Sequence, residues 1–328
     1  MKIGITYTLK SDVTAHAGAP DDALEEYDSD ATIESVAASL RRLGHTVRRL
    51  GYGRALLERL LESRPDMVFN LSEGVGGRSR EAHVPAVLEM LGIPFTHSDP
   101  LTLSVTHDKA VAKQIVAACG VTTPAFRVVR TTDEIAAIDL PFPLFVKPLF
   151  EGSSMGVRQE SRVEDEGSLR AQVERTVTDY RQPALVEEFC PGPEFTVAVL
   201  GTGPSASVLG VRGVTPRHLD AARFVYSLDR KRDGDYVVFD DLSRHPRALI
   251  EEVHQSALDA YRALGCRDVG RVDVRVNAAG KPAFLELNAL PGIAPGWSDL
   301  PLIAEKVGLD YDALIAKVLE HARARYGL

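Results

Sequence analysis

The sequence predicts an α/β protein that starts with a small parallel sheet and continues into two mixed α+β units. Residues 2–7 have the pattern of a strand, and residues 29–43 place apolar side chains at helical spacing up to Gly44. Strand and helix patterns keep alternating as far as residue 91, which is typical of a parallel sheet covered by helices. The length of 328 residues favours two or three structural units.

The first unit is the alternating segment itself. Apolar runs at 46–50 and 67–71 predict two more strands, and residues 54–61 and 82–91 predict the helices between and after them. We place this first domain at residues 1–96.

The second and third units mix helices with strands. For the second domain, residues 97–183, we expect helices at 108–118 and 164–178 and strands at 125–129, 144–147 and 156–160. For the third domain, residues 184–328, we expect helices at 246–264 and 310–325 and strands at 185–188, 195–200, 207–211, 269–276 and 283–287. No internal repeat or Pro/Ser-rich linker interrupts the sequence, so tight turns are expected at the boundaries.

Composition narrows the class of protein. The chain is 45% hydrophobic and 26% charged, with a net charge of −8 spread along its length. This balance argues against a broad nucleic-acid or membrane-surface footprint, so we expect no nucleic-acid or membrane partner. The three cysteines are widely spaced, which suggests neither a disulfide framework nor a zinc site. No signal peptide or apolar run of membrane length is seen, and a cytoplasmic location is expected.

The strongest local signal is a pair of strands with a polar face. Arg271 and Asp273 alternate with valines on one strand, and Glu286 and Asn288 flank Leu287 on the next. Since alternate residues of a strand share a face, two carboxylates and an amide oxygen are expected to converge. Such hard oxygen ligands suit magnesium that bridges nucleotide phosphates. A hairpin with outward-facing charges is the alternative.

A second signal is a lysine before a glycine- and serine-rich loop. Lys147 ends a strand pattern, and residues 151–157 follow as Glu-Gly-Ser-Ser-Met-Gly-Val. The N–H groups and hydroxyls of such a loop can fold over phosphates, although the P-loop pattern is absent. A plain turn between two strands is the alternative. Another glycine-rich stretch, residues 72–80, follows a strand at the end where α/β folds bind ligands, and it is either a ligand loop or simply a flexible one.

Taken in order, these motifs resemble those of D-alanine–D-alanine ligases of the ATP-grasp superfamily. The resemblance implies an N-terminal Rossmann-like domain and two α+β subdomains that grip ATP. It also implies ATP and two magnesium ions as cofactors, with manganese as a substitute. It spans most of the chain and rests on residues 88–96, 108–109, 147–156, 186–196, 270–273 and 286–292.

The resemblance assigns nucleotide contacts. Lys109 and Lys147 would hold phosphates as point charges. Adenine would meet the backbone of the hinge strand Glu187–Cys190 and the ring of Phe189, and Glu194 would accept hydrogen bonds from the ribose.

It also assigns the residues nearest the reaction. Asp273, Glu286 and Asn288 would bind the magnesium ions that neutralise the transferring γ-phosphoryl group. Arg271 and the N–H of Gly292 would stabilise the oxyanion of the tetrahedral intermediate.

Two more assignments concern loops over the site. Ser153 stands where the family has an active-site serine. A lid that excludes water is expected at residues 214–239, in which Lys231 matches a phosphate-binding lysine. A solvated surface loop is the alternative for this segment.

The amino-acid half of the pattern departs from the family. Arg232 stands where a tyrosine is typical, and it would suit a substrate with an extra carboxylate unless it points to solvent. Tyr27 aligns best with the family's ammonium-binding glutamate, for which Glu26 or Asp28 would substitute only by a shift. The substrates therefore do not follow from the resemblance.

Two further positions differ in the same way. The family's serine near the second substrate falls on Trp297 or Ser298, and its histidine after the third strand falls near Glu73. The chain's other histidines, such as His83, His97 and His107, are expected to be structural or exposed.

The sequence thus predicts an ATP-dependent carboxylate–amine ligase that acts through an acyl phosphate and releases ADP and phosphate. Its product would be a dipeptide or an amino-acid conjugate made from small-molecule substrates, and a homodimer is expected by analogy with the family. The alternatives are an ATP-grasp phosphotransferase that stops at a phosphorylated product and a non-catalytic nucleotide-binding module.

Overall fold

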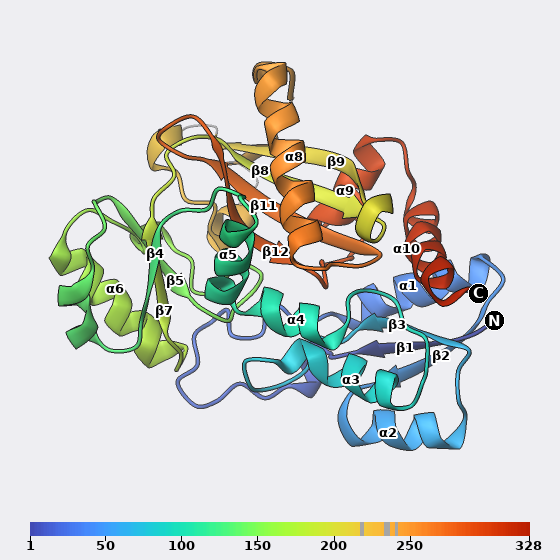
Figure 1. Ribbon diagram of the computed structural model, residues 1–328. Helices are drawn as coiled ribbons and strands as arrows, with labels where there is room; N and C mark the ends of the chain where they lie inside the picture. Colours follow the sequence, from blue (N-terminus) through green and yellow to red (C-terminus); the bar gives the residue numbers. More distant parts are fainter. Residues whose placement is uncertain (217–219, 233–236, 240–241) are drawn as a thin grey trace.

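The fold is built on three sheets, which a computed structural model describes for residues 1–328 except 217–219, 233–236 and 240–241 (Figure 1). The first sheet is parallel and has the strand order β2-β1-β3, as the sequence predicts. Its strands are β1 (Lys2–Tyr7), β2 (Thr46–Gly51) and β3 (Met67–Leu71). Its helices are α1 (Asp30–Arg42), α2 (Gly53–Glu62) and α3 (His83–Met90).

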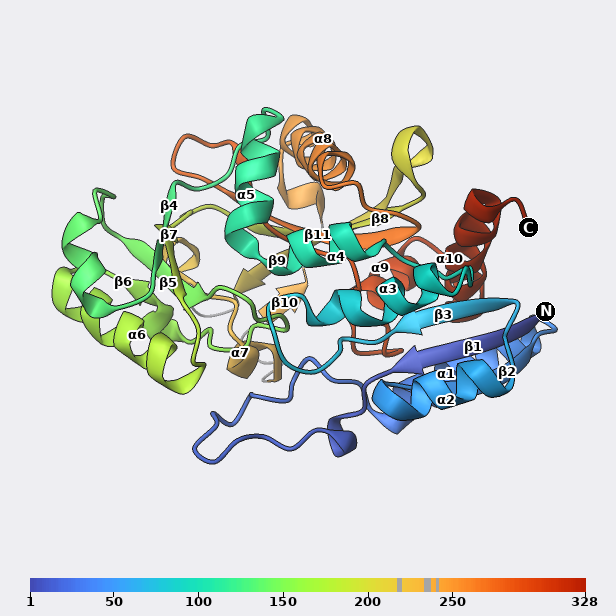
Figure 2. The same ribbon diagram turned by 60° about the horizontal axis from the view of Figure 1, so that its bottom comes forward.

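Alternation along the strands sends side chains to two faces of this first sheet. Phe69 of β3 packs with α1 and with the C-terminal helix α10 (Tyr311–Tyr326), whereas its neighbour Val68 packs with α2 and α3. Ser29 caps α1 by accepting a hydrogen bond from the N–H of Thr32 at 3.1 Å. Figure 2 shows that the carboxyl ends of these three strands point away from the chain termini and toward the rest of the molecule.

The second sheet is antiparallel and has the order β4-β7-β5-β6. Helix α6 (Glu166–Asp179) packs against it. Residues 184–188, which begin the third predicted domain, form a strand that pairs with two strands of this second sheet. Its strands are β4 (Phe126–Val129), β5 (Leu144–Pro148), β6 (Arg162–Val163) and β7 (Ala184–Glu188).

The strand predicted at residues 156–160 is wrong. Gly156 has a φ of +74°, and residues 159–161 form a 3-10 turn that precedes β6. The backbone N–H of Gly156 donates to Asp22 rather than to a neighbouring strand, so no ladder can form there.

The third sheet is antiparallel and has the order β10-β9-β8-β11-β12. Two helices, α4 (Pro100–His107) and α9 (Asp299–Lys306), were not predicted from the sequence, although Asp99 caps α4 and Pro100 occupies its first turn. The strands are β8 (Glu194–Leu200), β9 (Ser207–Pro216), β10 (Val237–Phe239), β11 (Val269–Val276) and β12 (Pro282–Asn288). The helices are α4 (Pro100–His107), α5 (Lys109–Ala118), α7 (Leu228–Arg232), α8 (Arg247–Ala263) and α9 (Asp299–Lys306).

The hydrophobic cores join these units across long stretches of sequence. Leu103 of α4 and Val116 of α5 share one core with Phe195 of β8 and Val272 of β11.

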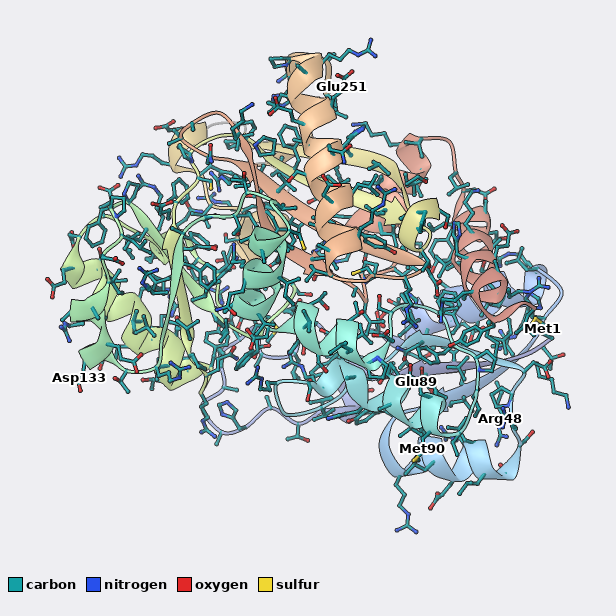
Figure 3. All side chains as sticks on the ribbon, in the orientation of Figure 1. Met1, Arg48, Glu89, Met90, Asp133 and Glu251 are labelled. Carbon is teal, nitrogen blue, oxygen red and sulfur yellow. The ribbon has the colours of Figure 1, made fainter. Side chains whose placement is uncertain are left out.

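The domain boundaries at 96/97 and 183/184 stay predictions. Figure 1 shows the second sheet at the left, the first at the lower right and the third above and between them. Charged side chains such as Glu89, Asp133 and Glu251 lie on the periphery (Figure 3).

None of the helices in the described part of the chain combines the length and the apolar composition that a membrane crossing requires.

Candidate active site

A cavity with about 850 Å³ of empty space, part of which is open to solvent, lies between the second and third sheets. The strands β5 and β7 supply one wall, and β8, β11 and β12 supply the other. It brings together eight of the residues that the sequence predicts at a nucleotide and metal site, namely Lys109, Lys147, Glu187, Phe189, Cys190, Glu194, Asp273 and Glu286.

Glu187 joins two lysines at the back of this cavity. Its carboxylate lies 3.0 Å from Nζ of Lys147 and 2.8 Å from Nζ of Lys113. All three side chains are buried, and Lys113 is fully so. Burial alone would raise the pKa of Glu187, but the two ammonium groups hold it below its usual value. Burial would likewise lower the pKa of Lys147, which Glu187 and Glu286 together raise. Lys147 is therefore a fixed cation facing the cavity.

The predicted metal ligands face one another across β11 and β12. Asp273 pairs in register with Glu286, and Arg271 pairs with Asn288. Asn288 Nδ2 lies 3.4 Å from Asp273 Oδ2, so the amide and the carboxylate converge as the alternation predicts. Glu286 approaches Nζ of Lys109 at 3.6 Å. Two carboxylates and one amide form a donor set that fits magnesium. A 180° flip of the Asn288 amide would turn its oxygen, rather than its nitrogen, toward Asp273.

Arg271 is held beside these ligands by two carboxylates. Its Nη2 lies 3.1 Å from Asp273, and its Nη1 lies 4.0 Å from Asp299. Arg212 of β9 also contacts Asp299, at 3.2 Å. The Nε of Arg271 is buried and has no partner in the described part of the molecule. The two carboxylates thus hold the guanidinium of Arg271 in place, and its Nε–H is not used by any hydrogen bond within the described residues.

Arginine and aromatic side chains lie together at the end of the cavity that is predicted to bind adenine. The guanidinium of Arg275 lies 4.6 Å from the ring centre of Phe189 and 3.3 Å from Glu194. Arg162 approaches the same ring at 5.0 Å. Phe189 and Glu194, predicted at adenine and ribose, therefore lie together and share Arg275 as a support.

A second and larger cavity opens beside the first and contains about 1,790 Å³ of empty space, part of which is open to solvent. It is lined by the carboxyl-end loops of the first sheet, by Ser153 of the glycine-rich loop and by Gly292. A Cβ atom at Gly292 would lie 2.9 Å from Ser298 Oγ, so a larger residue there would require Ser298 to move. Six residues line both cavities, namely Lys109, Glu151, Tyr226, Arg271, Glu286 and Asp299.

The glycine-rich loop is fastened to the N-terminal segment. Asp22, fully buried, accepts a 2.9 Å hydrogen bond from the N–H of Gly156 and a 2.7 Å bond from the hydroxyl of Tyr180. Arg158 adds an ion pair to Asp22 at 3.0 Å. Ser153 lies within this loop at a φ of +50°, a left-handed conformation.

Arg80 joins the same loop to the N-terminal segment at a second point. Its guanidinium donates to both oxygens of Glu26, at 2.8 and 2.9 Å, and to Glu151 at 3.0 Å. All three side chains are largely buried. Lys109 Nζ donates to the backbone oxygen of Glu151. Residues 72–80, which the sequence left open as a ligand loop or a flexible turn, thus reach the site through Arg80.

The positions that depart from the family fall mostly on the larger cavity. Glu26 and Asp28 line it, and Tyr27 is not among its lining residues. Trp297, Ser298 and Glu73 also line it. Lys231 and Arg232 belong to α7, but their side chains lie outside the described structure, and the role of the lid stays a prediction.

The histidines behave in three ways. His97 is fully buried, and burial lowers its pKa to about 3, so it is a neutral structural residue. His83 contacts Tyr52 on the outside. His107 is buried, lines the larger cavity and contacts Glu81 at 2.7 Å through Nδ1.

Several supporting residues were missed at the sequence level. Arg275 is two residues beyond Asp273 on β11, so the same alternation that singled out Arg271 and Asp273 was a signal for it. Lys113, Arg212 and Arg80 contact partners 71 to 87 residues away, and no local pattern predicts such pairs.

Known proteins resemble this chain in sequence and in fold. The family model described as "D-ala D-ala ligase C-terminus" matches residues 115–320. A protein of Sinorhizobium fredii, y4sG, is 35% identical over 306 residues, which are 89% of this chain and 88% of the relative. The D-alanine–D-alanine ligase of Bordetella petrii is 32% identical over 275 residues, or 83% and 81% of the two chains.

Solved structures show the same fold. The D-alanine–D-alanine ligase of Bacillus anthracis in complex with ATP covers 100% of this chain and 99% of its own, with a TM-score of 0.74 and 23% identity. The VanG D-Ala:D-Ser ligase of Enterococcus faecalis covers 98% and 99%, with a TM-score of 0.73 and 21% identity. The predicted ATP-grasp fold and the predicted family are therefore confirmed. The chain belongs to the D-alanine–D-alanine ligase family, and with it to the ATP-dependent ligases that form carbon–nitrogen bonds.

Proposed function

We propose that the protein uses ATP and magnesium to phosphorylate the carboxylate of one amino-acid-like substrate and then joins it to the amine of a second. The single observation that carries this proposal is that the two cavities meet at one set of side chains. Lys109, Arg271 and Glu286 line both of them. A phosphate donor in the smaller cavity and a carboxylate in the larger one would therefore react between these residues.

In this proposal the smaller cavity binds ATP. Lys109 and Lys147 hold its phosphates, Glu187–Cys190 and Phe189 meet adenine, and Glu194 meets the ribose. The Bacillus anthracis ligase, which has the same fold, was solved in complex with ATP, and this supports ATP as the nucleotide. Lys231 would add a phosphate contact from the lid.

Asp273, Glu286 and Asn288 would hold two magnesium ions, which offset the negative charge of the γ-phosphoryl group during transfer. Manganese would substitute, because it accepts the same oxygen ligands.

The larger cavity would hold both substrates. Arg271, whose Nε has no partner among the described residues, and the N–H of Gly292 would stabilise the oxyanion that forms when the amine attacks. Ser153 would orient the first substrate from the glycine-rich loop. Small-molecule substrates, a dipeptide or amino-acid conjugate as product, and a homodimeric assembly belong to this proposal.

A panel of amino acids tests it. D and L amino acids are supplied singly and in pairs with ATP and magnesium, while ADP is followed and products are identified by mass. ADP release that requires two substrates and yields an amide supports ligation. A stable phosphorylated product would identify a phosphotransferase instead, and nucleotide binding without ADP release would identify a binding module.

Variants of the metal ligands test the site. Asp273→Ala and Glu286→Ala are expected to abolish turnover while leaving the melting temperature close to that of the wild type, since both side chains border a cavity. Glu34→Gln, on the exposed face of α1, is a matched control and should retain full activity. Full activity in both metal-ligand variants would refute the assignment.

A further inference from the structure

The wall of the larger cavity that faces the first sheet is strongly acidic. Besides Glu25, which pairs with Lys10 at 2.9 Å, five carboxylates lie on it, contributed by the N-terminal segment, by the loop after β3 and by the glycine-rich loop. They are Glu26, Asp28, Glu73, Glu81 and Glu151.

The nearby basic side chains are too few to balance these carboxylates. Arg80 is shared between Glu26 and Glu151, and the imidazole of His107 faces Glu81. Lys109, which borders this wall, is already engaged by Glu286 and by the backbone oxygen of Glu151. Five carboxylates thus face one guanidinium and one imidazole.

Asp28 and Glu73 are the two carboxylates left over. Neither makes an ion pair with a side chain in the described part of the chain. Burial and the negative charges of Glu81, Glu26 and Asp28 raise the pKa of Glu73 well above its usual value, although Arg80 lowers it through space. Burial raises the pKa of Asp28 to about 7. A cation bound between these two groups would relieve both costs.

Two further observations connect the excess charge with a ligand. The acidic wall belongs to the same cavity as Arg271 and Gly292, so a molecule bound there reaches the reacting centre. His107 is 6% exposed and lines the same cavity, and its Nε2 has no hydrogen-bond partner among the described residues.

We propose that one of the two substrates is a basic amino acid, whose α-ammonium and side-chain cation are both held by this acidic wall through Asp28, Glu73 and their neighbours. The inference rests on the proposed ligase function and names the chemical class of one substrate. A single α-ammonium would leave the wall with carboxylates that still lack a counter-charge. A second cation on the same molecule compensates them, and the larger cavity extends from this wall to Arg271 and Gly292.

The test uses pairs of amino acids that differ in the side-chain charge. Lysine is compared with norleucine and ornithine with norvaline, which lack the terminal ammonium group, and arginine with citrulline, which keeps nearly the same shape without the charge. Each is supplied as D and L forms, with alanine as the second substrate. ADP release gives kcat/KM for each. We expect the best basic amino acid to exceed its neutral partner by about 100-fold, because a neutral side chain leaves a buried carboxylate unpaired.

Glu73→Gln and Asp28→Asn locate the effect. Each is expected to reduce the advantage of the basic amino acid to about tenfold or less, mainly through KM for that substrate, because each removes one charge and keeps the shape. The KM for ATP should not change. Glu34→Gln is the matched control, since it lies on the exposed face of α1 and pairs with Arg41.

The outcomes separate the two claims. If the wild-type enzyme uses every neutral partner as well as its basic counterpart, the substrate class is wrong while the ligase reaction stands. If no amino acid supports ADP release, the proposed function itself fails and the inference falls with it. The wild-type comparison decides the matter even if a variant does not fold.

Discussion

Replacing Glu187 by glutamine should weaken both the fold and nucleotide binding. The carboxylate lies 2.8 Å from Lys113 Nζ and 3.0 Å from Lys147 Nζ, and both lysines are buried. The substitution removes the carboxylate that faces Lys113 and leaves Lys147 with Glu286, 3.9 Å away, as its remaining counter-charge. Breaking a buried pair in this way typically costs about 3–5 kcal/mol. Because glutamine keeps one oxygen acceptor, we expect about 3 kcal/mol for Glu187→Gln.

The loss is measurable as a shift in melting temperature. For a chain of 328 residues, 1 kcal/mol corresponds to about 2 °C, so the expected decrease is about 6 °C at pH 7. Since the lysines hold the pKa of Glu187 below its usual value, its stabilisation is present at neutral pH and disappears as the pH falls through that lowered pKa. The difference between wild type and Glu187→Gln should therefore shrink in acid.

The same variant should bind ATP about tenfold more weakly, because Lys147 loses the anchor that fixes it toward the phosphates. Calorimetric titration with ATP and magnesium measures this loss. Adding Lys113→Met to Glu187→Gln removes one of the stranded charges and should restore part of the stability. A decrease of less than 1 °C in Glu187→Gln, together with unchanged ATP affinity, would refute the role assigned to this cluster.

Three other predictions concern the loop and the acidic wall. Asp22→Asn should raise KM for ATP about tenfold with little change in kcat, since it weakens the hydrogen bonds that hold the glycine-rich loop. Gly156→Ala should lower the melting temperature by about 4 °C and weaken ATP binding, because its φ is +74° and the added methyl group would overlap Pro148. Asp28→Asn should stabilise the substrate-free protein by about 2 kcal/mol at pH 8 and have a smaller effect at pH 5. Because burial raises the pKa of Asp28 to about 7, ionising this carboxyl lowers the free energy of unfolding progressively as the pH rises from about 4 through 7. Equal stabilisation at pH 5 and pH 8 would contradict this explanation.

The sequence predicted the part of the site that depends on local regularity. Alternation along two strands placed Asp273 and Glu286 on a shared face, and the register between β11 and β12 confirms that they are paired. The same rule reaches Arg275, which was overlooked. Local patterns are informative here because a strand fixes the direction of every second side chain.

Long-range pairs were beyond the reach of these patterns. Lys113 and Glu187 are far apart in sequence and meet only because β7 joins the second sheet, where the sequence did not place it. Residues 156–160 were predicted as a strand from their local pattern. In the structure, the N–H of Gly156 instead donates a hydrogen bond to Asp22, 134 residues away in sequence. Tertiary contacts override local propensity at such positions.

The most direct test of the acyl-phosphate mechanism follows the oxygen atom that it transfers. The amino acid that donates its carboxylate is labelled with ¹⁸O at both oxygens and is turned over with ATP, magnesium and the amine substrate, and the released phosphate is analysed by mass. Attack of the carboxylate on the γ-phosphorus, followed by attack of the amine on the acyl carbon, leaves one ¹⁸O in the phosphate for each amide formed. Phosphate without ¹⁸O, released at the same rate as the amide, would contradict the mechanism.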